Sequence, residues 1–148
     1  MKLFLLAATL FVCQISFSQS GIEKHFKIYD VKTKQLATVE QLAAACKDAN
    51  IIFFGEEHND SAGHYLEAAI FKALHQQYSN KLALSMEMFE TDCQLVLNEY
   101  FAGFISEDRL IKEGRAWSNY RDYKPVVEFA KQNKLSVIAA NTPRRYVN

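Results

Sequence analysis

Three short apolar runs, separated by helical patterns, constrain the fold of this chain more than any other sequence feature. They cover residues 51–54, 82–86 and 135–140, with the sequences IIFF, LALSM and LSVIAA. A short run without polar alternation is typical of a central parallel strand that is covered by helices on both faces. Because helices are expected between the runs, the sequence predicts an α/β fold, a parallel sheet with covering helices joined by right-handed crossovers.

Helical patterns fill the segments between these runs, and most of them carry a start or stop signal. A weakly alternating segment over residues 25–36 precedes them and favours a surface hairpin or an extended arm. Pro125 is expected in the first turn of the last helix, where a missing backbone N–H costs nothing. The other signals are a capping box at Thr38 and Gln41 with a helix end at Asn50, caps at Asp60 or Ser61 and at Thr91 or Asp92, a stop at Gly103, and a short helix from Ser106 to Gly114.

The predicted sheet is thin for an α/β domain. It contains only the three strands named above, and no helical pattern follows the third of them before Asn148. A strand that is apolar on both faces needs neighbouring strands and covering helices. We therefore expect a truncated domain, in which these residues form the first half of a larger α/β unit.

The N-terminus has the layout of a secretory signal peptide. One positive charge precedes an uncharged apolar run over residues 3–12, and small residues follow at the expected cleavage site. The run is shorter than the about 20 residues that span a bilayer. We expect residues 1–18 to be removed, which predicts an exported protein, with a buried N-terminal helix as the alternative. Acylation of Cys13 would instead make the protein a lipoprotein.

Charge, cysteine content and missing motifs exclude several classes of protein. The 17 basic and 17 acidic residues balance, so the chain offers no basic surface for nucleic acid. Cys46 and Cys93 remain after the leader, and we expect them to be buried small side chains instead of a disulfide. The sequence contains no HExxH, GxSxG, GxGxxG or Walker motif. Helical zinc proteases, serine hydrolases and nucleotide-binding enzymes are therefore disfavoured.

Polar residues follow all three apolar runs, and parallel sheets bind ligands at the carboxyl ends of their strands. Glu56 and His58 lie two residues apart, so they project to the same side of an extended chain. Such a pair can bind a divalent metal, or the carboxylate can hold the imidazole in one tautomer. The alternative interpretation is a solvated loop whose acidic residues cap the following helix. Glu87 ends the second run, where a charge is costly unless it is paired. Glu56, His58 and Glu87 are the predicted metal ligands.

Further candidate residues are expected near the same edge. His64 lies in the first turn of its helix, where it either points into the cleft or stays exposed. Trp117 and Tyr123 belong to an aromatic cluster that can stack on a flat ligand, and a tyrosinate can ligate haem iron. Such clusters also anchor helices to a sheet. Arg144 can pair with a carboxylate such as a haem propionate, or remain a surface charge.

Several segments of the chain together resemble one known family. The likeness extends from about Ile28 to the last residue. At these positions the chain is similar to the ChaN-like haem-binding uptake proteins of the Tiki superfamily. The matching segments are GEEHND at 55–60, MEMFETDCQ at 86–94, Trp117, YKP at 123–125, FA at 129–130 and AANTPR at 139–144.

The resemblance implies an exported haem-binding protein that takes part in haem or iron uptake, in the periplasm or anchored on the periplasmic or outer surface. Residues 28–148 would form the N-terminal part of its domain. The implied haem contacts are His58, His64, Tyr123 and Arg144, with the iron bound by a Tyr or a His. Haem is the expected ligand, and the expected partners are an outer-membrane haem receptor and a second copy in a homodimer.

The same resemblance leaves an enzymatic alternative open. The wider superfamily includes metal-dependent peptidases and esterase-like proteins, in which a similar strand end serves a metal ion. In that interpretation Glu56, His58 and Glu87 hold a divalent ion whose bound water is the nucleophile. We prefer the interpretation without turnover and assign no catalytic residue.

Overall fold

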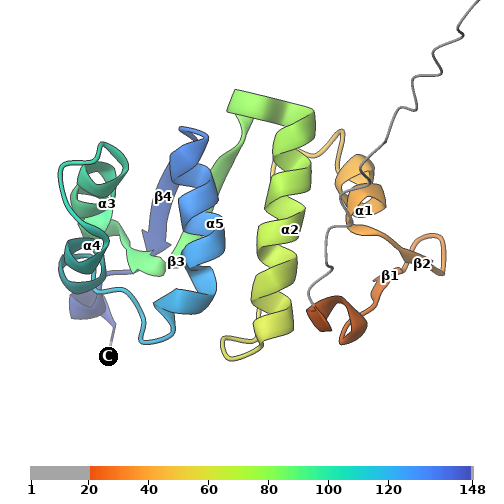
Figure 1. Cartoon of the computed structure of the whole chain (residues 1–148), viewed down its shortest axis with the longest axis horizontal. Coiled ribbons are helices and arrows are strands. Elements are labelled where there is room, and N and C mark those ends of the chain that lie inside the picture. Colours follow the sequence, from red (N-terminus) through yellow and green to blue (C-terminus); the bar gives the residue numbers. More distant parts are fainter. Residues whose placement is uncertain (1–20, 148) are drawn as a thin grey trace, which may run out of the picture.

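The computed structural model describes residues 21–147, so the expected leader at residues 1–18 and Cys13 lie outside the described residues. A small N-terminal unit lies at one end of the molecule, helix α2 (Ser61–Tyr78) lies in the middle, and a sheet with further helices forms the other end (Figure 1). Helices and a parallel strand pair occur in one chain, which confirms the predicted α/β class.

The N-terminal unit is a hairpin followed by a short helix. Strands β1 (Ile28–Asp30) and β2 (Gln35–Ala37) pair antiparallel, as the alternating segment predicts, after a 3-10 turn over Gly21–Lys24. The predicted capping box starts α1 (Val39–Ala45) with the Thr38 side chain. The helix ends at Ala45, earlier than the predicted end at Asn50.

The sheet of the main body has two parallel strands, β3 (Ala83–Glu90) and β4 (Ser136–Asn141). They confirm the second and third predicted strands, although β3 extends four residues further than the apolar run. Their register pairs Ala83 with Ser136 and is irregular between Met86 and Glu90. Side chains along most of β3 alternate between buried and exposed, as expected for a strand with one covered face.

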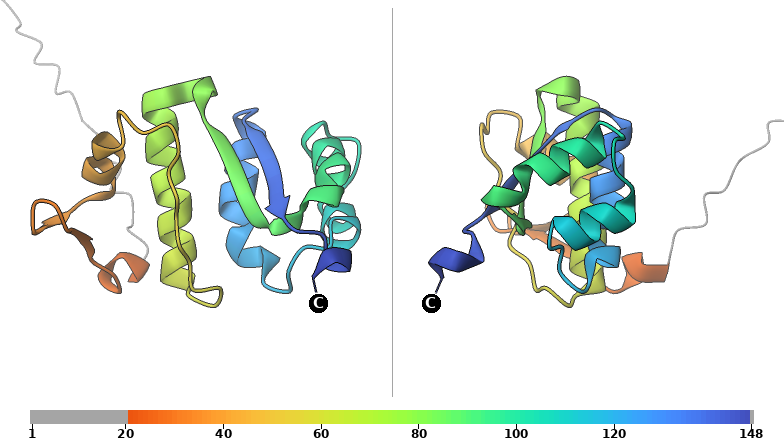
Figure 2. Two further views of the ribbon diagram at one scale, coloured as in Figure 1. Left: turned by 180° about the vertical axis from the view of Figure 1, so that it is seen from behind. Right: turned by 90° about the vertical axis from the view of Figure 1, so that its left-hand side faces the viewer.

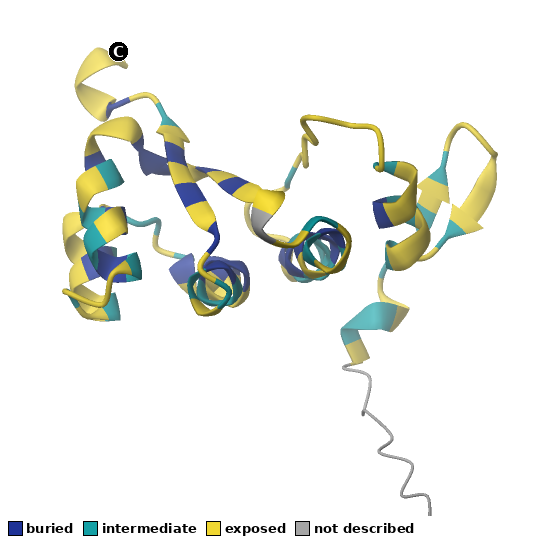
Figure 3. Ribbon diagram, turned by 90° about the horizontal axis from the view of Figure 1, so that it is seen from above, coloured by how far each residue is buried: buried dark blue, intermediate teal, exposed yellow. Residues whose placement is uncertain are grey.

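Helices α2 and α5 (Tyr120–Gln132) lie against the covered face of this sheet, as Figures 2 and 3 show. Helices α3 (Gln94–Phe101) and α4 (Glu107–Glu113) pack beside the end of the strands. A single apolar cluster joins all of these elements. Short 3-10 turns complete the body at Ser79–Lys81, Thr91–Cys93 and Arg144–Tyr146, and the largest fully buried side chains are Phe89, Leu97, Leu110, Val126, Val127 and Cys93.

The first predicted strand is wrong in the described chain. Residues 51–54 form no strand, and Figure 2 shows this part as a plain loop. All four side chains are exposed, and Phe53 is 92% exposed. The reason is that β3 pairs only with β4, so no neighbouring strand hydrogen-bonds to this segment. The sheet therefore has two strands in the described residues, not three.

Pro125 is also placed differently from the prediction, because α5 begins five residues before it. A proline inside a helix leaves the carbonyl four residues earlier without its N–H donor. That carbonyl belongs to Arg121, and both residues are exposed, so the carbonyl can bond to water. The buried face of α5 supplies the packing that offsets this lost hydrogen bond.

The remaining predictions at this level concern cysteines and membrane spans. Cys46 is half-buried and Cys93 is buried, and both thiols are free. Burial raises the pKa of the Cys93 thiol above its ordinary value. Across residues 21–147 no helix combines the length and apolar character that crossing a membrane requires.

Candidate functional site

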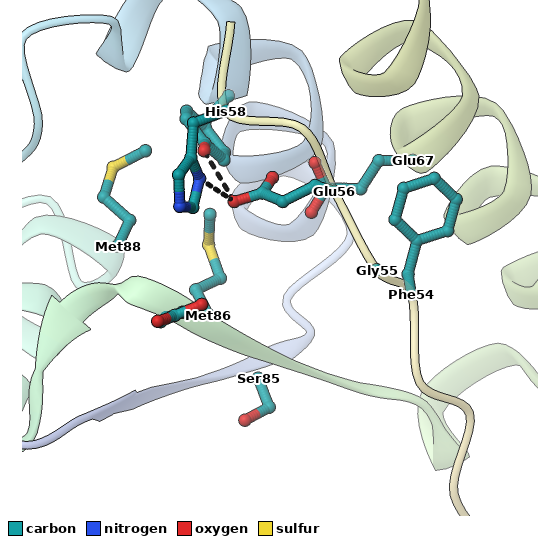
Figure 4. A pocket seen from close by; sticks show the side chains of 10 residues that line it. Phe54, Gly55, Glu56, His58, Glu67, Ser85, Met86 and Met88 are labelled. Atoms are coloured by element: carbon teal, nitrogen blue, oxygen red, sulfur yellow. Dashed lines mark hydrogen bonds and ion pairs between the residues drawn. The ribbon is translucent and has the colours of Figure 1, made fainter. Parts of the chain in front are cut away.

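The candidate site is built around Glu56, in the loop that leads into α2. One of its oxygens, Oε1, accepts a hydrogen bond from the Tyr123 hydroxyl at 2.8 Å. The same oxygen lies 2.8 Å from Nδ1 of His58, and Figure 4 shows both contacts as dashed lines. A carboxylate is acceptor-only, so the imidazole presents Nδ1–H to it, and the Nε2 lone pair of His58 is left free.

The backbone carbonyl of His58 fixes this loop to two helical regions. It accepts hydrogen bonds from the Asn119 side-chain amide at 2.6 Å and from Nε2 of His64 at 3.0 Å. The start of α2 is set by Asp60, whose side chain caps the backbone N–H of Ala62 at 3.0 Å, as predicted. These bonds hold the loop over the helices although it belongs to no strand.

Aromatic rings surround the same imidazoles. The His58 ring meets the edge of Trp117 at 4.7 Å between centroids, and Trp117 meets Tyr123 at 5.9 Å. His64 packs against Tyr123 at 4.3 Å. Burial, followed by the hydrogen bond to Glu56, raises the pKa of the Tyr123 phenol far above its ordinary value. The phenol therefore stays protonated and acts as a donor to Glu56.

Glu67, on the first half of α2, completes the cluster and was missed at the level of the sequence. Its Oε2 lies 3.7 Å from Nδ1 of His64, and the second oxygen of Glu56 lies 3.8 Å from that same nitrogen. Burial, and then the nearby Glu56 carboxylate, raises the pKa of Glu67. The available signal was the spacing of three residues between His64 and Glu67, which places both on one helix face.

A cavity of about 220 Å³ opens beside this cluster. Its walls come from the loop before α2, from α2 and α5, and from β3. Its lining residues are Phe54, Gly55, Glu56, His58, Glu67, Ser85, Met86, Glu87, Met88 and Tyr123. Figure 4 shows Glu56, Glu67 and His58 above the strand that carries Ser85 and Met86.

Of the predicted metal ligands, the structure brings Glu56 and His58 into contact, whereas Glu87 only lines the same cavity from β3. Glu87 follows the alternation of β3 and is exposed, while its neighbours Met86 and Met88 are buried. No hydrogen bond or ion pair joins Glu87 to Glu56 or His58 within residues 21–147. The expected cost of an unpaired charge does not arise, because this carboxylate faces solvent.

Of the predicted haem contacts, His58, His64 and Tyr123 meet in the Glu56 cluster, and Arg144 lies in a second one. The backbone N–H of Arg144 donates to Glu90 at 2.9 Å, and the Arg115 guanidinium donates to the same carboxylate at 2.7 Å. These bonds, led by the Arg144 N–H, keep the pKa of Glu90 below its ordinary value. Asp92 binds Arg115 and Arg145 beside them.

The sequence predicted that polar residues from the three segments would meet at one edge of the sheet. The structure instead places them in two clusters. The second cluster lies where the carboxyl ends of β3 and β4 meet, since Glu90 pairs with Asn141 in the sheet. The loop over residues 55–58 instead meets β3 earlier, at Ser85 to Met88. The difference arises because residues 51–54 do not join the sheet and so do not end at its edge.

Comparison with known proteins shows which family the chain belongs to. A family model described as "Haem-binding uptake, Tiki superfamily, ChaN" matches residues 42–148. The match covers most of the chain and includes both clusters. The chain therefore belongs to the ChaN family of haem-binding uptake proteins in the Tiki superfamily, which confirms the resemblance seen in the sequence. No curated protein and no solved structure gives a significant match.

Proposed function

We propose that this protein is an exported haem-binding protein that takes part in haem or iron uptake. Membership of a haem-binding uptake family supports haem as the ligand. The observation that carries the proposal for this chain is the imidazole of His58, whose side chain is 53% exposed and is oriented by Glu56. Export, delivery to an outer-membrane haem receptor and a homodimer belong to the proposal as expectations from the family resemblance.

His58 has the arrangement that metal-binding histidines usually show. A carboxylate or carbonyl on one ring nitrogen fixes the tautomer, orients the ring and raises the basicity of the other nitrogen. In this structure Oε1 of Glu56 is that carboxylate oxygen, and it also accepts a hydrogen bond from the Tyr123 hydroxyl. Nε2 of His58 is therefore the nitrogen that would bind the iron, and bound haem would supply that iron.

The surroundings of His58 place an aromatic ring and a few apolar side chains beside a cavity that also contains several acidic groups. Trp117 lies against the ring, and Phe54, Met86 and Met88 line the adjoining cavity. The cavity of about 220 Å³ is smaller than the about 300–1,000 Å³ of typical ligand pockets. The described residues thus offer a one-sided platform that cannot enclose a macrocycle.

The other predicted haem contacts differ in how accessible they are. His64 and Tyr123 are almost completely buried, so a macrocycle reaches neither in this conformation. Arg144 is 86% exposed, and its guanidinium makes one long contact of 3.9 Å with Glu90. We therefore keep Arg144 as the candidate for a propionate and place His58 ahead of Tyr123 as the iron ligand.

The His58→Ala substitution should abolish the absorption spectrum that is typical of haem whose iron is bound by a protein side chain. Titration of the full chain with hemin is expected to shift the Soret band and to saturate at one hemin per chain. Losing this nitrogen should weaken hemin binding by at least about tenfold and move the band towards that of free hemin. Absorption spectroscopy with parallel tryptophan quenching measures both effects.

Two variants provide controls for this titration. His25 is exposed and has no part in the cluster, so His25→Ala should bind hemin like the wild type. Tyr123→Phe removes only the hydroxyl, and the Soret position should be retained. A wild-type chain that leaves the hemin spectrum unchanged would refute the proposed function. A normal spectrum for His58→Ala would remove His58 as the ligand, and a lost band for Tyr123→Phe would assign the iron to Tyr123.

A further inference from the structure

Three acceptor atoms face one another beneath the His58 loop. They are Oε2 of Glu56, Nδ1 of His64 and Oε2 of Glu67, with Nδ1 lying 3.8 Å from the Glu56 oxygen and 3.7 Å from the Glu67 oxygen. One ligand atom from each of the three residues lies within 4.8 Å of the others. His64 is buried, and the two carboxylates are half-buried. Two carboxylate oxygens and an imidazole nitrogen from a loop and a helix thus converge on one small volume.

The hydrogen bonds around these atoms show which of them are free. Nε2 of His64 contacts the His58 carbonyl, which can only accept, so Nε2 carries the hydrogen and Nδ1 presents a lone pair. Oε1 of Glu56 is already bonded to Tyr123 and His58, which leaves Oε2 free. Nδ1 of His64 and Oε2 of Glu67 are buried and have no hydrogen-bond partner among the described residues.

No hydrogen bond joins Nδ1 of His64 to either of the two carboxylate oxygens. The two distances from Nδ1 of His64 are 3.7 Å to Glu67 and 3.8 Å to Glu56, beyond hydrogen-bonding range. Three lone pairs facing one another repel, and buried polar atoms without partners are costly. A cation placed between them would satisfy all three atoms at once.

We propose that Glu56, His64 and Glu67 bind one divalent transition-metal ion, of the class of Mn²⁺, Fe²⁺ or Zn²⁺. One imidazole and two carboxylates form a mixed nitrogen and oxygen ligand set that suits these ions. Ligand bonds of about 2.0–2.2 Å place neighbouring ligand atoms about 3.0–3.5 Å apart. The two spacings from Nδ1 of His64, 3.7 Å and 3.8 Å, therefore need to contract by roughly 0.2–0.8 Å when the ion binds.

The surroundings supply the other features of a metal site. His58 and Tyr123 hold the outer oxygen of Glu56, and the His58 carbonyl orients His64, so two of the ligands are supported from behind. Glu56 and Glu67 also line the cavity of about 220 Å³, which gives the ion a route in and leaves room for bound water. Three protein ligands leave coordination positions open towards that cavity.

This site differs from the sequence-predicted set and from the proposed haem ligand. It uses His64 and Glu67 in place of His58 and Glu87. The nitrogen proposed for haem iron is Nε2 of His58, which is no part of the ion site. The two sites share Glu56, but through different oxygens.

The test is a titration of the full chain, stripped of metal with a chelator, with Co²⁺ as the probe. Visible absorption of Co²⁺ reports an ordered nitrogen and oxygen ligand set, and calorimetry gives the stoichiometry and the affinity. The wild type should bind one Co²⁺ per chain. Glu67→Gln keeps the shape of the side chain, and it should weaken binding by about a hundredfold, because even supporting residues are worth about 10–100-fold.

Two matched variants make the result specific. Glu57 is exposed next to Glu56 in the chain, and Glu87 belongs to the alternative set, so Glu57→Gln and Glu87→Gln should leave Co²⁺ affinity within about twofold of the wild type. Absence of saturable binding, or wild-type affinity in Glu67→Gln, would overturn the proposal. A loss confined to Glu87→Gln would overturn it in favour of Glu56, His58 and Glu87. Hemin binding should be unchanged in Glu67→Gln, which separates this test from that of the haem proposal.

Discussion

Phe89→Ala should lower the free energy of unfolding by about 4 kcal/mol, within the about 3–5 kcal/mol typical of a buried phenylalanine. Phe89 is 0% exposed and lies near the end of β3, in the apolar cluster that joins the sheet to the helices. Removing the ring takes away apolar burial and leaves a cavity that the surrounding elements fill only in part. The loss is large beside the about 5–15 kcal/mol that stabilises a typical domain.

Chemical denaturation followed by circular dichroism measures this change. Phe104→Ala removes the same group from a side chain that is 81% exposed, so it should alter the free energy of unfolding by less than about 0.5 kcal/mol. Equal effects of the two substitutions would contradict the position of the core described above.

Gly114→Ala should destabilise the protein by about 2–3 kcal/mol, because there is no space for a Cβ atom at this position. Gly114 is buried at the C-terminal end of α4. A Cβ there would lie 2.5 Å from the backbone oxygen of Leu110 and 3.5 Å from the Phe89 ring. The closest atom is a backbone oxygen of α4 itself, so relief requires the last turn of this helix to change its backbone geometry.

Gly55→Ala is the matched control for this substitution. A Cβ atom at Gly55 would meet no atom within 4 Å, so thermal unfolding should be almost unchanged. The comparison of both midpoints with that of the wild type tests the tight last turn of α4, between Leu110 and Gly114. Equal midpoints for the two alanine variants would contradict the lack of space for a Cβ atom in that turn.

Local signals in the sequence predicted much of this fold. The capping box at Thr38, the cap at Asp60 and the helix end at Gly114 all depend on side-chain and backbone chemistry within a few residues, and the structure contains each of them. The strands at 83–90 and 136–141 were predictable because apolar runs between helices have few other places in an α/β fold. These features are set by short-range chemistry and burial.

The errors come from interactions that a linear pattern does not contain. Residues 51–54 have the composition of a buried strand, but a strand also needs a partner whose backbone bonds to it, and in the described chain β3 pairs only with β4. Pro125 suits a first helical turn, yet the buried side chains of Tyr120 and Tyr123 extend α5 in front of it. Tertiary packing decided both positions.

Part of the candidate site was predictable from local sequence spacing, whereas the rest depends on tertiary packing. Glu56 and His58 are neighbours in sequence, so their contact followed from spacing alone. His64 was placed only as one of two alternatives, and Glu67 was missed, because their approach to Glu56 depends on how the loop crosses α2. The alternation of β3 explains why Glu87 is exposed and is not buried beside Met86 and Met88.

The central claim is that the two histidines beside Glu56 are held in opposite tautomers. His58 carries its hydrogen on Nδ1 and presents Nε2 outward, whereas His64 carries its hydrogen on Nε2 and presents Nδ1 to Glu56 and Glu67. Long-range ¹H–¹⁵N correlation spectra of the metal-free and haem-free chain distinguish the tautomers directly, at about pH 8.5, where an ordinary imidazole is neutral. We predict an Nδ1–H signal for His58 and an Nε2–H signal for His64. The reverse assignment, or two histidines that exchange freely between tautomers, would contradict the account.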